Sequence, residues 1–127
     1  MAKVKLLIDT DIFIDYLNTG FLSTILESKG FEIYYSIVTK KELLSKRGLK
    51  DTERQAILFT LRRHRIILLD NRIANIYSDL RRQHPTLDKK EDALVAATAL
   101  ARRLPLLTRN WKHYKMIKGI TLFTGTE

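Results

Sequence analysis

A short apolar run that ends abruptly in acid most constrains what this chain can fold into. Residues 4–8 read Val-Lys-Leu-Leu-Ile, and Asp9 follows directly. A run of this kind is typical of a parallel strand that is buried on both faces. The next apolar residues, Ile12, Phe13 and Leu17, change to the spacing of a helix. The pattern therefore predicts a strand followed by a helix, with Asp9 at the carboxyl end of the strand.

Strand-like and helical segments alternate along the rest of the chain. Further strand-like runs cover residues 31–36, 66–69, 105–108 and 120–123, and helical spacing covers about 21–29, 39–47, 51–65, 71–83 and 89–103. The helix expected over 89–103 is rich in alanine and apolar nearly all round, which predicts a buried central helix. Alternation of this kind predicts βαβ units, a mainly parallel sheet and a three-layer α/β architecture.

Length and composition narrow the class of protein. A chain of 127 residues that is 45% hydrophobic suits one domain over residues 1–127. The absence of cysteine excludes disulfides and thiolate-bound zinc, and no apolar run approaches the ~20 residues of a transmembrane helix. We therefore expect a soluble, cytoplasmic protein. The formal net charge of +9 favours a polyanionic partner, with nucleic acid as the first candidate and an anionic membrane surface as the alternative.

Three acidic residues are expected at the same edge of the sheet. Asp9 follows the first strand, Glu42 lies near the start of the helix after the second, and Asp92 lies near the start of the central helix. Each acidic segment also has a simpler interpretation as a helix start. After Asp9, Thr10 or Asp11 can cap the first helix, and Glu42 can form a capping box with Thr39. Asp92 lies in a first turn, where a negative charge suits the helix dipole. Taken together, converging carboxylates predict a site for a hard cation, Mg²⁺ or Mn²⁺.

Four segments then resemble a known family. They are residues 7–17, 38–43, 91–100 and 106–110, of which Asp92 to Leu100, Asp-Ala-Leu-Val-Ala-Ala-Thr-Ala-Leu, is the most specific. Their order and spacing resemble a PIN-domain ribonuclease of the VapC toxin type. The resemblance implies a five-stranded parallel sheet, Mg²⁺- or Mn²⁺-dependent endoribonuclease activity, a homodimer, and neutralisation by a small antitoxin protein encoded beside the toxin. By the same match, Asp9, Glu42 and Asp92 become the metal ligands and catalytic residues.

The remaining predicted site residues surround these acids. Thr10 and Thr108 are expected to hydrogen-bond ligands or substrate. Arg109 and Lys112 are expected to contact the RNA backbone, with a solvated cation as the alternative for Arg109.

The chain departs from the family pattern in two ways. A further acid is common at the position of Asn110 or three residues later, where His113 stands, as a metal ligand or a surface histidine. Asp11 stands where Asn or Ser is frequent. The number of bound metal ions therefore depends on Asn110 and Asp11. The aromatic residues Tyr34, Tyr35, Trp111 and Tyr114 are predicted to be core or dimer contacts rather than platforms for bases.

Two other functions compete with the nuclease. A catalytically silent PIN-like module could bind RNA or a partner after losing a metal, and Asn110 leaves that alternative open. A receiver-like signalling domain would need a phospho-accepting Asp after the third strand and a Lys at the end of a later one. Asp70 supplies the first, but the run over 105–108 lacks the lysine.

Overall fold

The fold is built on a parallel sheet whose strands carry almost no polar side chains toward the core. The structure is a computed structural model and describes residues 2–85, 87 and 89–124. The sheet has four strands in the order β3-β2-β1-β4, and every pairing is parallel. The strands are β1 (Val4–Ile8), β2 (Phe31–Ser36), β3 (Arg65–Ile67) and β4 (Leu106–Leu107). The predicted α/β class and parallel sheet are confirmed.

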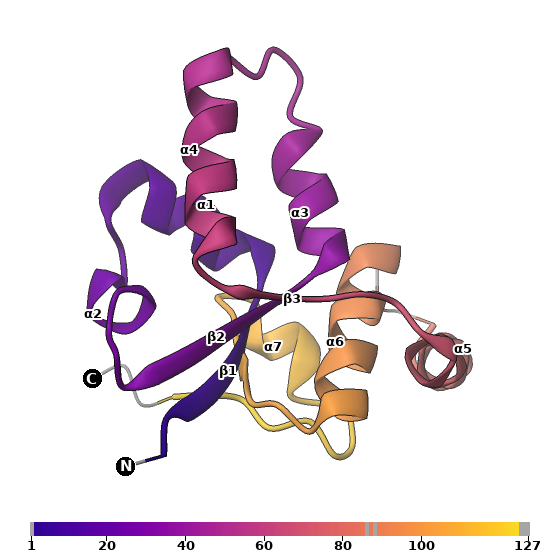
Figure 1. The fold of residues 1–127 in the computed structure, drawn as a ribbon. Helices are drawn as coiled ribbons and strands as arrows, with labels where there is room; N and C mark the ends of the chain where they lie inside the picture. The colour runs from indigo at the N-terminus through magenta and orange to yellow at the C-terminus, as the bar shows by residue number, and fades with distance from the viewer. Residues whose placement is uncertain (1, 86, 88, 125–127) are drawn as a thin grey trace.

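Helices cover both faces of this sheet (Figure 1). They are α1 (Thr10–Thr19), α2 (Ser23–Leu26), α3 (Ile37–Leu44), α4 (Asp51–Arg62), α5 (Asn71–Gln83), α6 (Lys90–Arg102) and α7 (Trp111–Tyr114). Leu6 and Ile8 of β1 pack in one core cluster with residues of α1, α2 and α4, whereas Leu7 packs in a second cluster with α5 and α6. The alternation of side chains along the central strand thus produces the three layers.

The central helix α6 is built from small residues because it packs closely on its neighbours. Ala93, Ala96 and Ala97 are completely buried, and α6 packs against α5 as well as against the sheet. Small side chains allow this close approach, and a bulky side chain here would collide with the sheet or with α5. The predicted buried helix is confirmed, with bounds within a residue of those expected.

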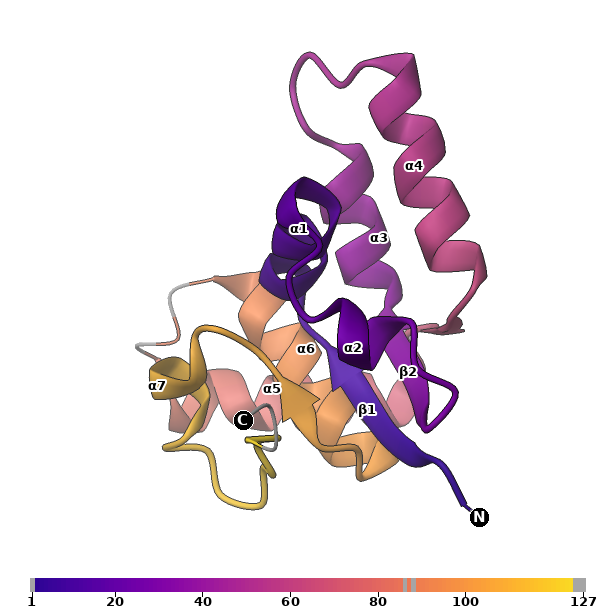
Figure 2. The ribbon, with the colours of Figure 1, turned by 90° about the vertical axis from the view of Figure 1, so that its left-hand side faces the viewer.

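The helix α1 rises directly from the end of β1 (Figure 2). It ends at Gly20, which has a φ of 76° and donates its N–H to the carbonyl of Tyr16 at 2.8 Å. A left-handed residue closes the helix in this way, and glycine adopts that conformation without a steric cost. The start and end of α1 are therefore both determined locally.

The fifth strand is shorter than the sequence predicts. In place of a strand over 120–123, the structure has a single parallel bridge between Leu106 and Leu122. The Leu106 N–H donates to the carbonyl of Thr121 at 2.8 Å, and the Phe123 N–H donates to Leu106 at 2.9 Å. The neighbouring β4 has only two residues, so the segment over 120–123 has little strand to pair with. Within the described residues, every helix is too short or too polar to cross a membrane.

Candidate active site

Asp9 lies at the carboxyl end of β1, as predicted, and is held by three donors. The side chain is only 4% exposed. The Thr10 N–H donates to its Oδ1 at 2.8 Å, while the Thr108 hydroxyl donates to Oδ2 at 2.8 Å and the Tyr114 hydroxyl at 3.3 Å. Burial raises the pKa of the Asp9 carboxyl, the charge of Asp92 adds to the rise, and these donors act in the opposite direction. Asp9 itself is the N-cap of α1, so the prediction that Thr10 or Asp11 caps this helix is wrong.

Asp11 supplies a second carboxylate beside Asp9. Its Oδ2 accepts a bond from the Arg109 N–H at 3.2 Å. Its Oδ1 is buried and has no hydrogen-bond partner among the described residues. Burial, followed by the nearby charge of Asp9, raises the pKa of Asp11 to about 6. A buried carboxylate oxygen without a donor is costly, and a ligand at this point would relieve that cost.

Glu42 reaches the same edge from α3. The Thr10 hydroxyl donates to its Oε1 at 2.7 Å, and Thr39 Oγ1 lies 2.9 Å from Thr10 Oγ1. The N-cap of α3 is Ser36, whose hydroxyl accepts the Val38 N–H at 3.1 Å, so the predicted capping box of Thr39 and Glu42 is wrong. The helix begins earlier than expected because the strand before it ends in a serine that can cap. Glu42 is thereby left to face the site.

The carboxylates of this site repel one another. Burial raises the pKa of Glu42, and the charges of Asp9, Glu91 and Asp92 raise it further, against the bond from Thr10. Asp92 occupies the first turn of α6, as predicted, and is half-buried. The structure therefore brings the acids of β1, α3 and α6 within electrostatic reach of each other.

The chemistry of this donor set fits a hard divalent cation. All of the acidic ligands offer oxygen, Asp11 Oδ1 is an unpartnered buried acceptor in the described part of the chain, and the carboxylates raise one another's pKa. Across the described ranges, no three carboxylate or imidazole groups already converge as a preformed ion site. Ion binding would thus require these carboxylate side chains to move closer together.

The segment between β4 and α7 borders the site. The Asn110 N–H donates to Thr108 Oγ1 at 3.0 Å, so Asn110 meets the site through its backbone. The Arg109 guanidinium pairs with Asp15 Oδ2 at 2.7 Å. The Arg109 side chain is 61% exposed in this ion pair. Both alternatives considered for Arg109, an RNA contact and a solvated cation, therefore stay predictions.

Tyr114 is a site residue that sequence reasoning missed. It was predicted to be a core or dimer contact, and it is fully buried, but its hydroxyl also donates to Asp9. Burial first, and then the charges of Asp9 and Asp92, raise the pKa of Tyr114 far above its ordinary value, so it remains a neutral donor. The signal in the sequence was weak: Tyr114 and Ile117 share a helical spacing that turns both inward, behind Thr108.

Hollows flank the carboxylates on two sides. An apolar groove of about 390 Å³ between α1, α3 and α4 reaches Glu42, and its floor includes Leu17, Leu43 and Ile57. A second hollow of about 390 Å³ begins at Thr108 and Arg109 and runs over the β4 edge.

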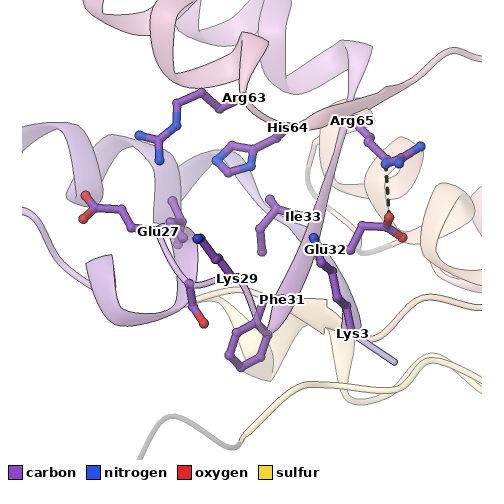
Figure 3. A pocket seen from close by; sticks show the side chains of 11 residues that line it. Lys3, Glu27, Lys29, Phe31, Glu32, Ile33, Arg63, His64 and Arg65 are labelled. Carbon is purple, nitrogen blue, oxygen red and sulfur yellow. Dashed lines mark ion pairs between the residues drawn. The ribbon is translucent and has the colours of Figure 1, made fainter. Parts of the chain in front are cut away.

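A third hollow lies away from the acids, around the amino end of β2 (Figure 3). Its wall contains Lys3, Lys29, Arg63, His64 and Arg65 together with Glu27 and Glu32. Glu32 pairs with Arg65 at 3.2 Å. This hollow, which holds more basic than acidic side chains, is therefore separate from the acidic site.

Comparisons with known proteins point to one family. A model of the PIN domain matches residues 6–119. The chain is 31% identical to Ribonuclease VapC1 of Methanocaldococcus jannaschii over 123 residues, which cover 93% of this chain and 85% of that protein. Among solved structures, a toxin–antitoxin complex from Klebsiella pneumoniae is 29% identical, with a TM-score of 0.68 and coverage of 91% of this chain and 95% of that one. DNA-bound VapBC from Salmonella typhimurium, 18% identical, matches the fold with a TM-score of 0.82 over 94% of this chain and 97% of that one.

Proposed function

The chain belongs to the PIN-domain family, and on that premise we propose that it is a metal-dependent endoribonuclease, the toxin of a toxin–antitoxin pair. The observation that carries this proposal is the gathering of Asp9, Glu42 and Asp92 at one edge of the sheet in a chain of net charge +9. The carboxylates suit a cation, and the basic remainder suits RNA. We expect this activity in the cytoplasm.

Asp9, Glu42 and Asp92 would hold Mg²⁺ or Mn²⁺, which when bound supplies a Lewis acid that activates water and neutralises charge on the phosphate. The chain's own hydroxyls prepare the ligands. Thr108 and Tyr114 donate to Asp9, which favours its ionised form and restricts its rotation. Thr10 does the same for Glu42. Asp11 adds negative charge beside Asp9 and offers an unpartnered oxygen within the described structure.

The test removes one charge and measures both activity and metal binding. Asp92→Asn keeps the shape of the side chain and is expected to abolish most RNA cleavage, since losing an essential ligand costs at least ~100-fold. Mn²⁺ should raise the midpoint of thermal unfolding of the parent much more than that of the variant. Asp51→Asn is the matched control, because Asp51 also lies in the first turn of a helix but is exposed on α4.

The alternative, a catalytically silent module, gives a different pattern. Such a protein would bind RNA without cleaving it, and chelation would leave its behaviour unchanged. Equal cleavage by identically purified parent and Asp92→Asn proteins would mean that the site is assigned to the wrong residues or that the nuclease is a contaminant.

We also propose that a small antitoxin occupies the groove between α1, α3 and α4. This groove is largely apolar and ends at Glu42, so a bound segment could reach the carboxylates with a basic side chain. The solved relatives named as toxin–antitoxin complexes support a partner of this class. The resemblance further supports a homodimer.

The partner proposal is tested with the product of the neighbouring reading frame. Adding it should stop cleavage and increase the mass measured by light scattering above that of a homodimer. A neighbouring product that leaves cleavage unchanged would remove the antitoxin proposal, and a monomer at micromolar concentration would remove the dimer.

A further inference from the structure

The hollow that begins at Thr108 is partly walled by exposed aromatic rings. Trp111 is 47% exposed, so it is not the core contact that the sequence predicts as one alternative, and Phe21 is 44% exposed. Both residues line this hollow of about 390 Å³. Thr108, at its inner end, donates to Asp9, and the chain continues from there through Asn110 to Trp111. The hollow therefore shares Thr108 with the carboxylate site and adjoins it.

Cations surround the indole of Trp111. The Nζ atoms of Lys112 and Lys115 lie 5.6 Å and 5.2 Å from its ring centroid, and both lysines are exposed. Neither lysine has an ion pair with another described residue. An aromatic ring beside uncompensated positive charge is the combination that binds single-stranded nucleic acid, because bases stack on the ring and phosphates contact the cations.

We propose that this hollow receives an unpaired base of single-stranded RNA next to the cleaved phosphate, with Trp111 as the stacking platform and Lys112 and Lys115 as phosphate contacts. The inference rests on the proposed nuclease function and adds to it a binding site for one base of the substrate, with named contact residues. A base inside a duplex is already stacked on its neighbours, so this site can receive only an unpaired base.

Charge argues against a protein occupant of the same surface. A second copy or an apolar partner segment would have to cover Lys112 and Lys115, and the interior of a protein interface is depleted in lysine. RNA instead supplies a counter-charge to each lysine as it covers the ring. The apolar groove on the opposite side of the carboxylates has no comparable pair of lysines over an aromatic ring in the described structure.

Because Trp111 is the only tryptophan of the chain, its fluorescence reports directly on this site. The probe is an eight-nucleotide single-stranded oligoribonucleotide, added in EDTA and low salt so that metal-dependent cleavage is absent. We expect saturable quenching of the Trp111 emission. An abasic oligomer with the same phosphates should bind more weakly and quench little, and a duplex of equal length should behave like the abasic oligomer.

Variants separate stacking from general attraction. Trp111→Leu should weaken oligomer binding by roughly 5- to 150-fold, the range that corresponds to the stacking of one base, and Trp111→Phe should lie between it and the parent. In cleavage assays, Trp111→Leu should raise KM more than it lowers kcat. Phe59→Leu is the control, because Phe59 is 63% exposed on α4 and has Arg63 over its ring at 6.0 Å, far along the chain from the site.

Several results would overturn the inference without touching the nuclease assignment. Cleavage of RNA by the parent with no quenching of Trp111 would do so, as would equal binding of the abasic and intact oligomers. A Trp111→Leu protein that loses dimerisation and keeps its RNA affinity would show that this surface is an interface between copies. Quenching without any cleavage would instead leave the base-binding site standing and remove the nuclease.

Discussion

At the scale of single residues, the site depends on hydroxyl groups as much as on acids. Thr108 Oγ1 accepts the Asn110 N–H and donates to Asp9, so one side chain links the segment after β4 to the carboxylate at the end of β1. This bond stabilises the ionised form of Asp9 against the burial that raises its pKa. Thr108 therefore contributes both to the position of the Asp9 carboxylate and to its charge state, alongside Thr10 and Tyr114.

Replacing Thr108 with valine should reduce cleavage by roughly 10- to 150-fold and move the acidic limb of the rate profile to higher pH. Valine has the same shape but no hydroxyl, and a lost bond to a charged group costs roughly 1.5–3 kcal/mol. The sign follows from Asp9: without the donor its pKa rises further, so a higher pH is needed to ionise it. The measurement is kcat/KM against pH. Thr108→Ser should restore the parent profile, and a parent-like valine variant would contradict the role of this hydroxyl.

At the scale of elements, the placement of Asp92 depends on how closely α6 lies on the sheet. Ala93, one residue after this acid, is completely buried, and so are Ala96 and Ala97 on the following turn. A helix with larger side chains on this face would stand further from β1, and its first turn would carry Asp92 away from Asp9. The alanines therefore affect the site by setting the distance between α6 and β1.

The substitution Ala96→Leu should lower the free energy of unfolding by roughly 1–3 kcal/mol, because a well-packed core cannot accept the added methylene groups without strain. Cleavage should fall as well, since α6 is displaced. The same exchange at Ala74 is the matched control: this residue is exposed on α5 and should change stability by less than ~0.5 kcal/mol. Denaturant unfolding measures the free energy of unfolding of both variants. Equal effects of the two substitutions would mean that α6 is not tightly packed.

At the scale of the whole molecule, basic side chains also gather away from the acids. The hollow around the amino end of β2 is lined by the cations Lys3, Lys29, Arg63 and Arg65 together with two glutamates (Figure 3). His64 lies in the wall of that hollow, half-buried, with its ring 6.2 Å from that of Phe13. Burial lowers the pKa of His64, and the charge of Arg63 lowers it further.

Stability should consequently fall on acidification through a contribution from His64. Because the folded pKa is below the unfolded value of about 6.5, the unfolded chain binds the proton more readily, and the contribution is complete above that pH and lost as the pH falls below it. The raised pKa of Asp11 acts in the opposite direction, since protonation near pH 6 favours the fold. Comparing parent and His64→Gln proteins by denaturant unfolding at pH 7.5 and 5.5 isolates the histidine. The parent should lose more stability than the variant between these values, and parallel losses would contradict the assignment.

The sequence by itself determined the architecture and the positions of the acids. Parallel strands buried on both faces must be continuous apolar runs, so their ends are visible wherever the run stops in a charged residue, as at Asp9. Asp92 was located for a similar reason, because the alanine-rich run that follows it could only be a buried helix. These patterns depend only on residues that are close together in the sequence, so they can be read before the tertiary structure is known.

Only the tertiary structure decided what each acid contacts. The prediction for Tyr114 lacked its bond to Asp9 because 105 positions separate the two residues, and periodicity carries no signal over that distance. The capping of α1 and α3 was also assigned to the wrong residues, since several nearby side chains could cap and backbone geometry selects among them. The fifth strand shrank to one bridge because its partner β4 is short. Within the described chain, Asp11 Oδ1 is buried without a partner where β1, α1 and the segment after β4 come together. Tertiary packing brings these segments together, and no sequence pattern predicts it.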